Sequence, residues 1–126
     1  MPARILVVEA TRDVRVLIVD VLSAAGHEVT SVAYGAEALV LTEWPGFDLI
    51  LSDLTLRAFD GAQLYWEIGA RWPDLASRVI CVTDGHDAGA IDHARLRAAS
   101  VPFLVKPFLP EHLLDVVTRV LARSAP

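Results

Sequence analysis

The sequence predicts a three-layer α/β fold, in which one doubly wound parallel sheet of five strands carries helices on both faces. Short apolar runs alternate, five times in succession, with segments whose apolar residues recur at helical spacing. Several of these runs have an unbroken apolar centre, such as ILVV at 5–8 and VICV at 79–82, which is typical of strands buried on both faces. A length of 126 residues suits one domain. We therefore predict a single domain over residues 1–126.

The first strand–helix unit has the clearest pattern in the chain. Residues 4–8 (RILVV) are almost entirely apolar and predict a buried strand. Apolar residues then recur every three or four positions over residues 12–25, which predicts an amphipathic helix. Gly26 follows as the expected C-cap, because glycine adopts the left-handed backbone conformation there at little cost.

The middle of the chain repeats the alternation. Residues 28–33 predict a second strand and residues 35–44 a short helix, which the following Pro45 and Gly46 end. Residues 47–53 (FDLILSD) predict a third strand, again buried.

The last elements complete the pattern. Apolar residues between Leu64 and Trp72 predict a helix that ends before Pro73, because the residue before proline avoids helical geometry. The remaining predicted elements are strand 78–83, helix 87–99, strand 102–105 and a final amphipathic helix through Leu113 and Leu121. Right-handed crossovers restrict the topology of such a chain, so we expect a flavodoxin-like (βα)5 sheet of order 2-1-3-4-5.

Composition narrows the functional classes. The net charge is −5, and the few basic residues are scattered, so we expect no direct binding of nucleic acid. The apolar runs are too short to span a bilayer, and the N-terminus has no signal-peptide pattern, so we expect a cytoplasmic protein with no membrane contact. The single cysteine, Cys81, lies in an apolar run and is expected to be buried.

Polar side chains follow four of the predicted strands, at the point where each strand ends. They are Glu9, Asp53, Thr83 and Lys106. Ligands of open parallel sheets bind outside the carboxyl ends of the strands, so we expect these residues to share one site. Carboxylate oxygens suit Mg²⁺, and lysine and threonine are donors suited to phosphoryl oxygens. A carboxylate in such a site can itself accept a phosphoryl group.

The chain resembles a response-regulator receiver domain over nearly its whole length. The resemblance rests on four blocks that match the family in order and spacing: RILVVEATRDVRVLIVDVLSAAGHEV, FDLILSDLTLRAFDG, RVICVTD and FLVKPF. It implies that Asp53 is the phospho-acceptor and that Thr83 and Lys106 bind the phosphoryl oxygens. It also implies that Phe103 changes rotamer together with Thr83, and that the peptide bond from Lys106 to Pro107 is cis.

The same resemblance implies a Mg²⁺ site formed by Glu9, Asp53 and the backbone carbonyl of Thr55. The family usually ends its first strand on two acids, of which the second is the more direct metal ligand. Here Ala10 stands in that second place, and its methyl group cannot coordinate a metal. We therefore predict weak binding of Mg²⁺.

Two further positions depart from the family pattern. Asp84 follows Thr83, where the family usually has a small residue, and its charge would repel an incoming phosphoryl donor or supply a replacement metal ligand. Arg57 stands four residues after Asp53, where the family often has proline. It would alter the loop or place a cation near the phosphate.

The resemblance implies signalling rather than enzymatic activity. A histidine kinase or histidine phosphotransfer protein would phosphorylate Asp53, and a surface within residues 87–123 would then bind a downstream protein or form a homodimer. The sequence leaves open a degenerate receiver that binds proteins without phosphorylation. A flavin enzyme is disfavoured because EATRDV, after the first strand, has no glycine for a phosphate-binding loop. A haloacid-dehalogenase-type phosphatase is also disfavoured, because DLT (53–55) lies on the third strand.

Overall fold

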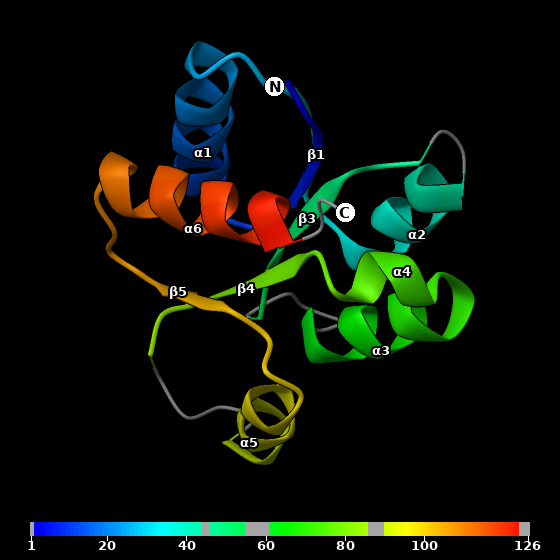
Figure 1. The fold of residues 1–126 in the computed structure, drawn as a ribbon. Helices are drawn as coiled ribbons and strands as arrows, with labels where there is room; N and C mark the ends of the chain where they lie inside the picture. The colour runs from blue at the N-terminus through cyan, green and yellow to red at the C-terminus, as the bar shows by residue number, and fades with distance from the viewer. Residues whose placement is uncertain (1, 44–45, 55–60, 86–89, 124–126) are drawn as a thin grey trace.

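A computed structural model describes residues 2–43, 46–54, 61–85 and 90–123. Its centre is one sheet of five parallel strands in the order β2-β1-β3-β4-β5, as the sequence predicts (Figure 1). The strands are β1 (Arg4–Val8), β2 (Glu28–Val32), β3 (Leu49–Asp53), β4 (Val79–Thr83) and β5 (Phe103–Val105).

Helices cover both faces of the sheet, which makes three layers. They are α1 (Arg12–Ala24), α2 (Gly35–Glu43), α3 (Gly61–Arg71), α4 (Pro73–Ala76), α5 (Ala90–Ala98) and α6 (Pro110–Arg123). Figure 1 shows α1 and α6 together on one face, with α2, α3 and α4 on the other. The fold is therefore the flavodoxin-like arrangement that the strand–helix alternation predicts.

Side chains of each strand alternate between two separate cores. Ile5 and Val7 of β1 face α1 and α6, whereas Leu6 and Val8 face the helices of the other side. The helices on the first side contribute Ile18, Leu22, Leu113, Val117 and Val120. Those on the second side contribute Ala38, Leu64, Ile68, Leu75 and Leu96. Because each buried leucine or isoleucine stabilises the fold by roughly 1.5–3 kcal/mol, these two cores fix the register of the strands.

Local signals end the helices much as the sequence predicts. Gly26 has φ +95°, and its N–H donates to the carbonyl of Ser23 at 3.0 Å. The N–H of His27 donates to the carbonyl of Leu22 at 3.1 Å, so the pair of bonds closes the C-terminus of α1 in a Schellman motif. The helix ends at Ala24, one residue before the predicted boundary.

The short helix α4 is the element that the sequence prediction missed. The structure ends α3 at Arg71, and a new helix begins at Pro73, because proline lacks an N–H and is tolerated in a first helical turn. Strands β3 and β4 also start later than predicted. Asp48, which the prediction placed in the third strand, lies just before β3. Its carboxylate accepts the backbone N–H of Arg4 at 2.8 Å.

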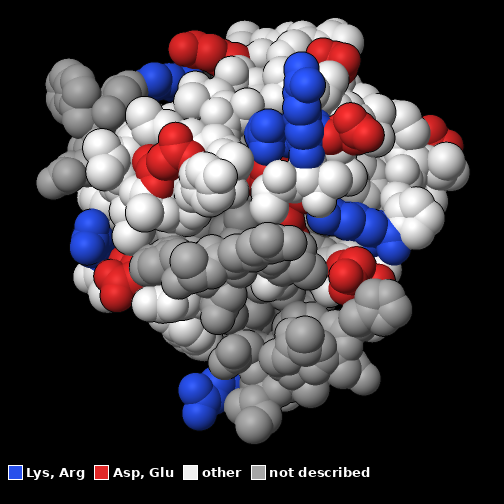
Figure 2. Space-filling view, turned by 180° about the vertical axis from the view of Figure 1, so that it is seen from behind, with Lys and Arg blue, Asp and Glu red and all other residues white. Residues whose placement is uncertain are grey.

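The charged surface is mixed. On the face that Figure 2 shows, positive and negative side chains lie among one another and among uncharged residues. Within the described part of the chain, none of the helices combines the length and the apolar character needed to cross a bilayer.

Candidate functional site

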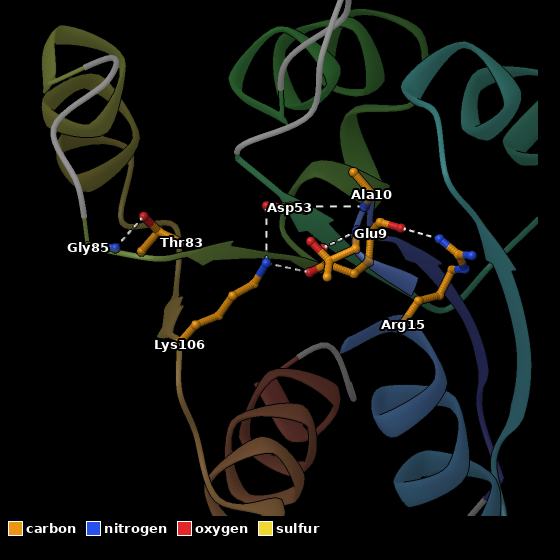
Figure 3. A network of polar contacts seen from close by, with 8 residues as sticks. Glu9, Ala10, Arg15, Asp53, Thr83, Gly85 and Lys106 are labelled. Atoms are coloured by element: carbon orange, nitrogen blue, oxygen red, sulfur yellow. Dashed lines mark hydrogen bonds and ion pairs between the residues drawn. The ribbon is translucent and has the colours of Figure 1, made fainter. Parts of the chain in front are cut away.

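The carboxyl ends of the strands bring three charged side chains together. Glu9 follows β1, Asp53 ends β3 and Lys106 follows β5. All three converge above the edge of the sheet in Figure 3. Glu9 is 1% exposed and Asp53 is fully buried, so the site places two carboxyl groups in the protein interior.

The ammonium group of Lys106 lies between the two carboxylates. Its Nζ is 2.8 Å from Oε1 of Glu9 and 3.7 Å from Oδ1 of Asp53. The second oxygen of each carboxylate accepts a backbone N–H: Oε2 of Glu9 from Thr11 at 3.0 Å, and Oδ2 of Asp53 from Ala10 at 3.4 Å. The turn that leads from β1 into α1 therefore orients both carboxylates toward the lysine.

Arg15 supports the same turn from the first helix. Its guanidinium donates a hydrogen bond to the backbone carbonyl of Glu9 at 2.8 Å. This contact holds the backbone of Glu9, while its side chain is held by Lys106 and Thr11. Both the backbone and the carboxylate of Glu9 are thus held in place.

Burial makes the ionised form of Glu9 costly. Desolvation, followed by the hydrogen bond and the negative charge of Asp53, raises the pKa of Glu9 from 4.5 to about 7. The Lys106 ammonium and the Thr11 N–H lower the pKa, but their combined effect is smaller. More positive charge at this edge of the sheet would therefore stabilise the ionised carboxylates.

Thr83 lies beside this cluster rather than within it. Its hydroxyl oxygen accepts the backbone N–H of Gly85 at 3.1 Å, and its carbonyl accepts the N–H of Lys106 at 2.7 Å. Gly85 has φ +85°, a left-handed conformation that favours glycine. In Figure 3, Thr83 stands apart from the three charged residues, near the start of the Lys106 side chain.

The remaining predicted residues have separate places. Phe103 begins β5, is half-buried and packs against the core, with the guanidinium carbon of Arg97 4.6 Å from its ring centroid. The peptide bond between Lys106 and Pro107 is cis. Ala10 and Asp84 are exposed. Thr55 and Arg57 lie outside the described residues.

Two features of the site were not predicted from the sequence. One is the ion pair of Lys106 with Glu9, since the sequence assigned Lys106 only to the phosphoryl group. The opposite charges of Glu9 and Lys106, each directly after a predicted strand, were the available signal. The other is Ser52, whose buried Oγ has no hydrogen-bond partner among the described residues. In the sequence, Ser52 could be recognised only as a polar residue in a largely apolar strand.

The carboxylate oxygens of Glu9 and Asp53 suit Mg²⁺, but they give it only a few protein ligands. Glu9 and Asp53 already hold one cation in common, the Lys106 ammonium. Within the described segments, no three acidic, histidine or cysteine side chains form a group that could hold a metal ion. Mg²⁺ tolerates such a site, because it retains several waters and often takes only one or two carboxylates from a protein.

Comparison with known proteins agrees with the fold and identifies the family. Residues 5–118 match the family model of the response regulator receiver domain, and the chain therefore belongs to that family. It is 36% identical over 121 residues to the response regulator protein FleR of Pseudomonas aeruginosa, covering 94% of this chain and 24% of FleR. It is 32% identical over 123 residues to the chemotaxis protein CheY of Bacillus subtilis, covering 96% of this chain and 99% of CheY.

A solved structure shares the same fold. The crystal structure of a CheY-like response regulator receiver domain protein from Methanospirillum hungatei superposes with a TM-score of 0.88 and 25% identity, covering 98% of this chain and 97% of that one. The chain thus spans about a quarter of FleR but nearly all of the two CheY-like proteins. Receiver domains accept phosphoryl groups in two-component signalling, bind Mg²⁺ at an acidic site, and interact with histidine kinases and downstream targets.

Proposed function

We propose that this receiver accepts a phosphoryl group on Asp53 from a phosphohistidine of a histidine kinase or histidine phosphotransfer protein. The observation that carries the proposal is the convergence of the buried Asp53 with Glu9 and Lys106 at the carboxyl edge of the sheet. A buried carboxylate with a lysine ammonium beside it can attack phosphorus while the charge that accumulates on the phosphoryl oxygens is neutralised.

In this reaction, an ionised oxygen of Asp53 attacks the phosphorus atom of the donor. A P–O bond to Asp53 forms as the P–N bond to the donor histidine breaks, and the bonding electron pair stays on the imidazole nitrogen. The product is an acyl phosphate. Lys106 and Thr83 stabilise the phosphoryl oxygens as hydrogen-bond donors, for which the Thr83 hydroxyl is free to donate its proton while it accepts from Gly85.

Mg²⁺, when bound, supplies positive charge to the same oxygens. Glu9 and Asp53 would hold it, together with the Thr55 carbonyl that the family resemblance implies. The absence of an acid at Ala10 leaves a site with fewer carboxylates than the family pattern, so the proposed affinity for Mg²⁺ is low.

A groove next to Lys106 supports a protein donor. It has a volume of about 520 Å³ and is lined by Val14, Leu17, Asp84, Lys106, Pro107 and Phe108. Leu17 is 43% exposed, so the groove presents apolar surface beside Lys106. A donor protein could bury this surface and bring its phosphohistidine to Asp53. Asp84 lines the same groove, so its charge lies close to the approach of any donor.

A second function is favoured by Ala10 together with the Lys106 ion pairs. Lys106 already compensates part of the charge of both carboxylates, so the site is held together without any phosphoryl chemistry. A degenerate receiver of this kind would bind its protein target constitutively, through the surface within residues 87–123.

The two functions differ in a measurement of intact mass. The protein is incubated with acetyl phosphate or phosphoramidate, with and without Mg²⁺, beside the variants Asp53→Asn and Asp84→Asn. The proposal expects the mass of one phosphoryl group on the wild-type protein and on Asp84→Asn, but none on Asp53→Asn. The added group should be released by hydroxylamine, which cleaves acyl phosphates. No gain from either donor at high Mg²⁺ would favour the degenerate receiver.

A further inference from the structure

A second cavity lies at the opposite end of β5 from the candidate site. It has a volume of about 310 Å³, and its walls come from the start of β5 and from the C-terminal half of α6. Figure 1 shows β5, the edge strand of the sheet, between α6 and α5. Because all the strands are parallel, the start of β5 lies at the amino edge of the sheet, whereas Asp53 and Lys106 lie at the carboxyl edge. The cavity is therefore separate from the place of the proposed phosphorylation.

One face of α6 gives this cavity both apolar and charged walls. Val116, Arg119, Val120 and Arg123 stand at positions i, i+3, i+4 and i+7 of the helix, so their side chains lie on the same side of it. Val120 is 2% exposed, whereas both arginines are exposed. Phe103, the first residue of β5, lines the cavity as well. The cavity therefore combines an apolar floor with a cationic rim.

Positive charge prevails around this floor. Among the described residues, the charged side chains that line the cavity are both arginines. Arg119 pairs with Asp115 at 3.2 Å, but the two side chains are 68% and 66% exposed. An ion pair so exposed contributes little stability, so Arg119 can exchange Asp115 for another anion. Arg97 of α5 adds a third guanidinium, whose carbon lies 4.6 Å from the ring centroid of Phe103.

We propose that this cavity binds a small organic acid, in which a carboxylate or phosphate group is attached to an apolar body about as large as a benzene ring. Guanidinium groups bind both kinds of anion through paired N–H donors. The apolar body would lie against Phe103 and Val116, while Arg119 and Arg123 would bind the anionic group.

The volume of the cavity sets the size of this ligand. Small-molecule sites of proteins occupy roughly 300–1,000 Å³, so a cavity of about 310 Å³ is at the small end of that range. A dinucleotide cofactor is therefore too large for it. An inorganic anion would leave the apolar floor uncovered, and a neutral molecule would make no use of the arginines.

The first test is a titration of the ¹⁵N-labelled full chain, followed by magnetic resonance, without metal and without a phosphoryl donor. The probes are benzoate and phenyl phosphate, with benzamide as the neutral control and inorganic phosphate as the control without an apolar body. We expect the two organic acids to bind with dissociation constants of about 1 mM, and at least about tenfold more tightly than either control. The amide signals that shift should be those of cavity residues such as Phe103 and Arg119.

The second test separates the arginines of the cavity from the general effect of net charge. Arg119→Gln and Arg123→Gln should each weaken the binding of benzoate about fivefold or more. Arg12→Gln is the matched control, because it removes an equal charge from the exposed start of α1, and it should change the affinity by less than about twofold. Far-ultraviolet circular dichroism first establishes that each variant is folded.

The third test addresses the apolar floor without a change of charge. Val116 is half-buried, and Val116→Phe places a larger side chain in the cavity. Benzoate should then bind at least about tenfold more weakly, because the space for its ring is filled. An unchanged affinity of this folded variant would contradict binding inside the cavity.

Each outcome of the titrations decides for or against the site. Binding of either organic acid that depends on Arg119 and Arg123 supports it, and the tighter of the two acids identifies the anionic group. The inference is overturned if neither acid shifts cavity signals at about 10 mM, or if benzamide or inorganic phosphate binds as tightly as the acids. These measurements need neither Mg²⁺ nor Asp53, so their failure leaves the proposed function untouched, and failure of phosphoryl transfer leaves this site untouched.

Discussion

Replacement of Glu9 by glutamine should change how the stability of the protein depends on pH. Burial raises the pKa of Glu9 from 4.5 to about 7, and Glu9 is 1% exposed. Between pH 4.5 and about pH 7, Glu9 is mostly protonated in the folded protein and mostly ionised in the unfolded chain. Stability due to this group is therefore fully present below about pH 4.5 and is lost as the pH rises through about 7. The free energy of unfolding that Glu9 contributes in this way is up to about 3 kcal/mol.

Urea unfolding of the wild-type protein and Glu9→Gln measures this effect, at about pH 4.5 and about pH 8 and with a chelator present. The free energy of unfolding of the wild-type protein, relative to that of Glu9→Gln, should fall by up to about 3 kcal/mol between the two conditions. The exposed Glu37→Gln is the control and should show no such change. An equal difference between wild type and Glu9→Gln at both values of pH would refute the reasoning.

Three other substitutions or reagents test the remaining features. Ala10→Asp restores an acid at the edge of β1 and should tighten Mg²⁺ binding about tenfold or more, by calorimetry; unchanged affinity would place the metal elsewhere. Burial raises the pKa of Cys81 to about 12, so a thiol reagent at mildly alkaline pH should label the native protein far more slowly than the unfolded chain. Leu22→Ala should cost about 2–5 kcal/mol in urea unfolding, whereas Leu17→Ala on the same helix should cost less than about 1 kcal/mol, because Leu22 is fully buried and Leu17 is 43% exposed.

The fold followed from the sequence because each local signal is strong and independent of distant residues. An apolar run such as residues 4–8 has few stable placements other than a strand covered on both faces. Gly26 ends a helix through its own backbone freedom. The short helix α4 was missed because four residues carry too little periodicity, and Pro73 reads equally well as the end of one helix or the start of another.

The site was predictable to the level of its location. The order of strands places Glu9, Asp53, Thr83 and Lys106 at one edge, since parallel strands all end on the same side of the sheet. The roles of these residues stay predictions, and the sequence could not rank their distances.

The sequence by itself determined the strand–helix alternation and the expected strand order, because periodicity and apolar character are local properties that do not change with small shifts of the backbone. Only the tertiary structure decided how the charges at the edge pair. The choice of Lys106 between Glu9 at 2.8 Å and Asp53 at 3.7 Å depends on where two loops, about a hundred residues apart in the chain, place their side chains. Electrostatic energies change steeply with such distances and with burial, and neither the distances nor the burial can be predicted from the sequence alone.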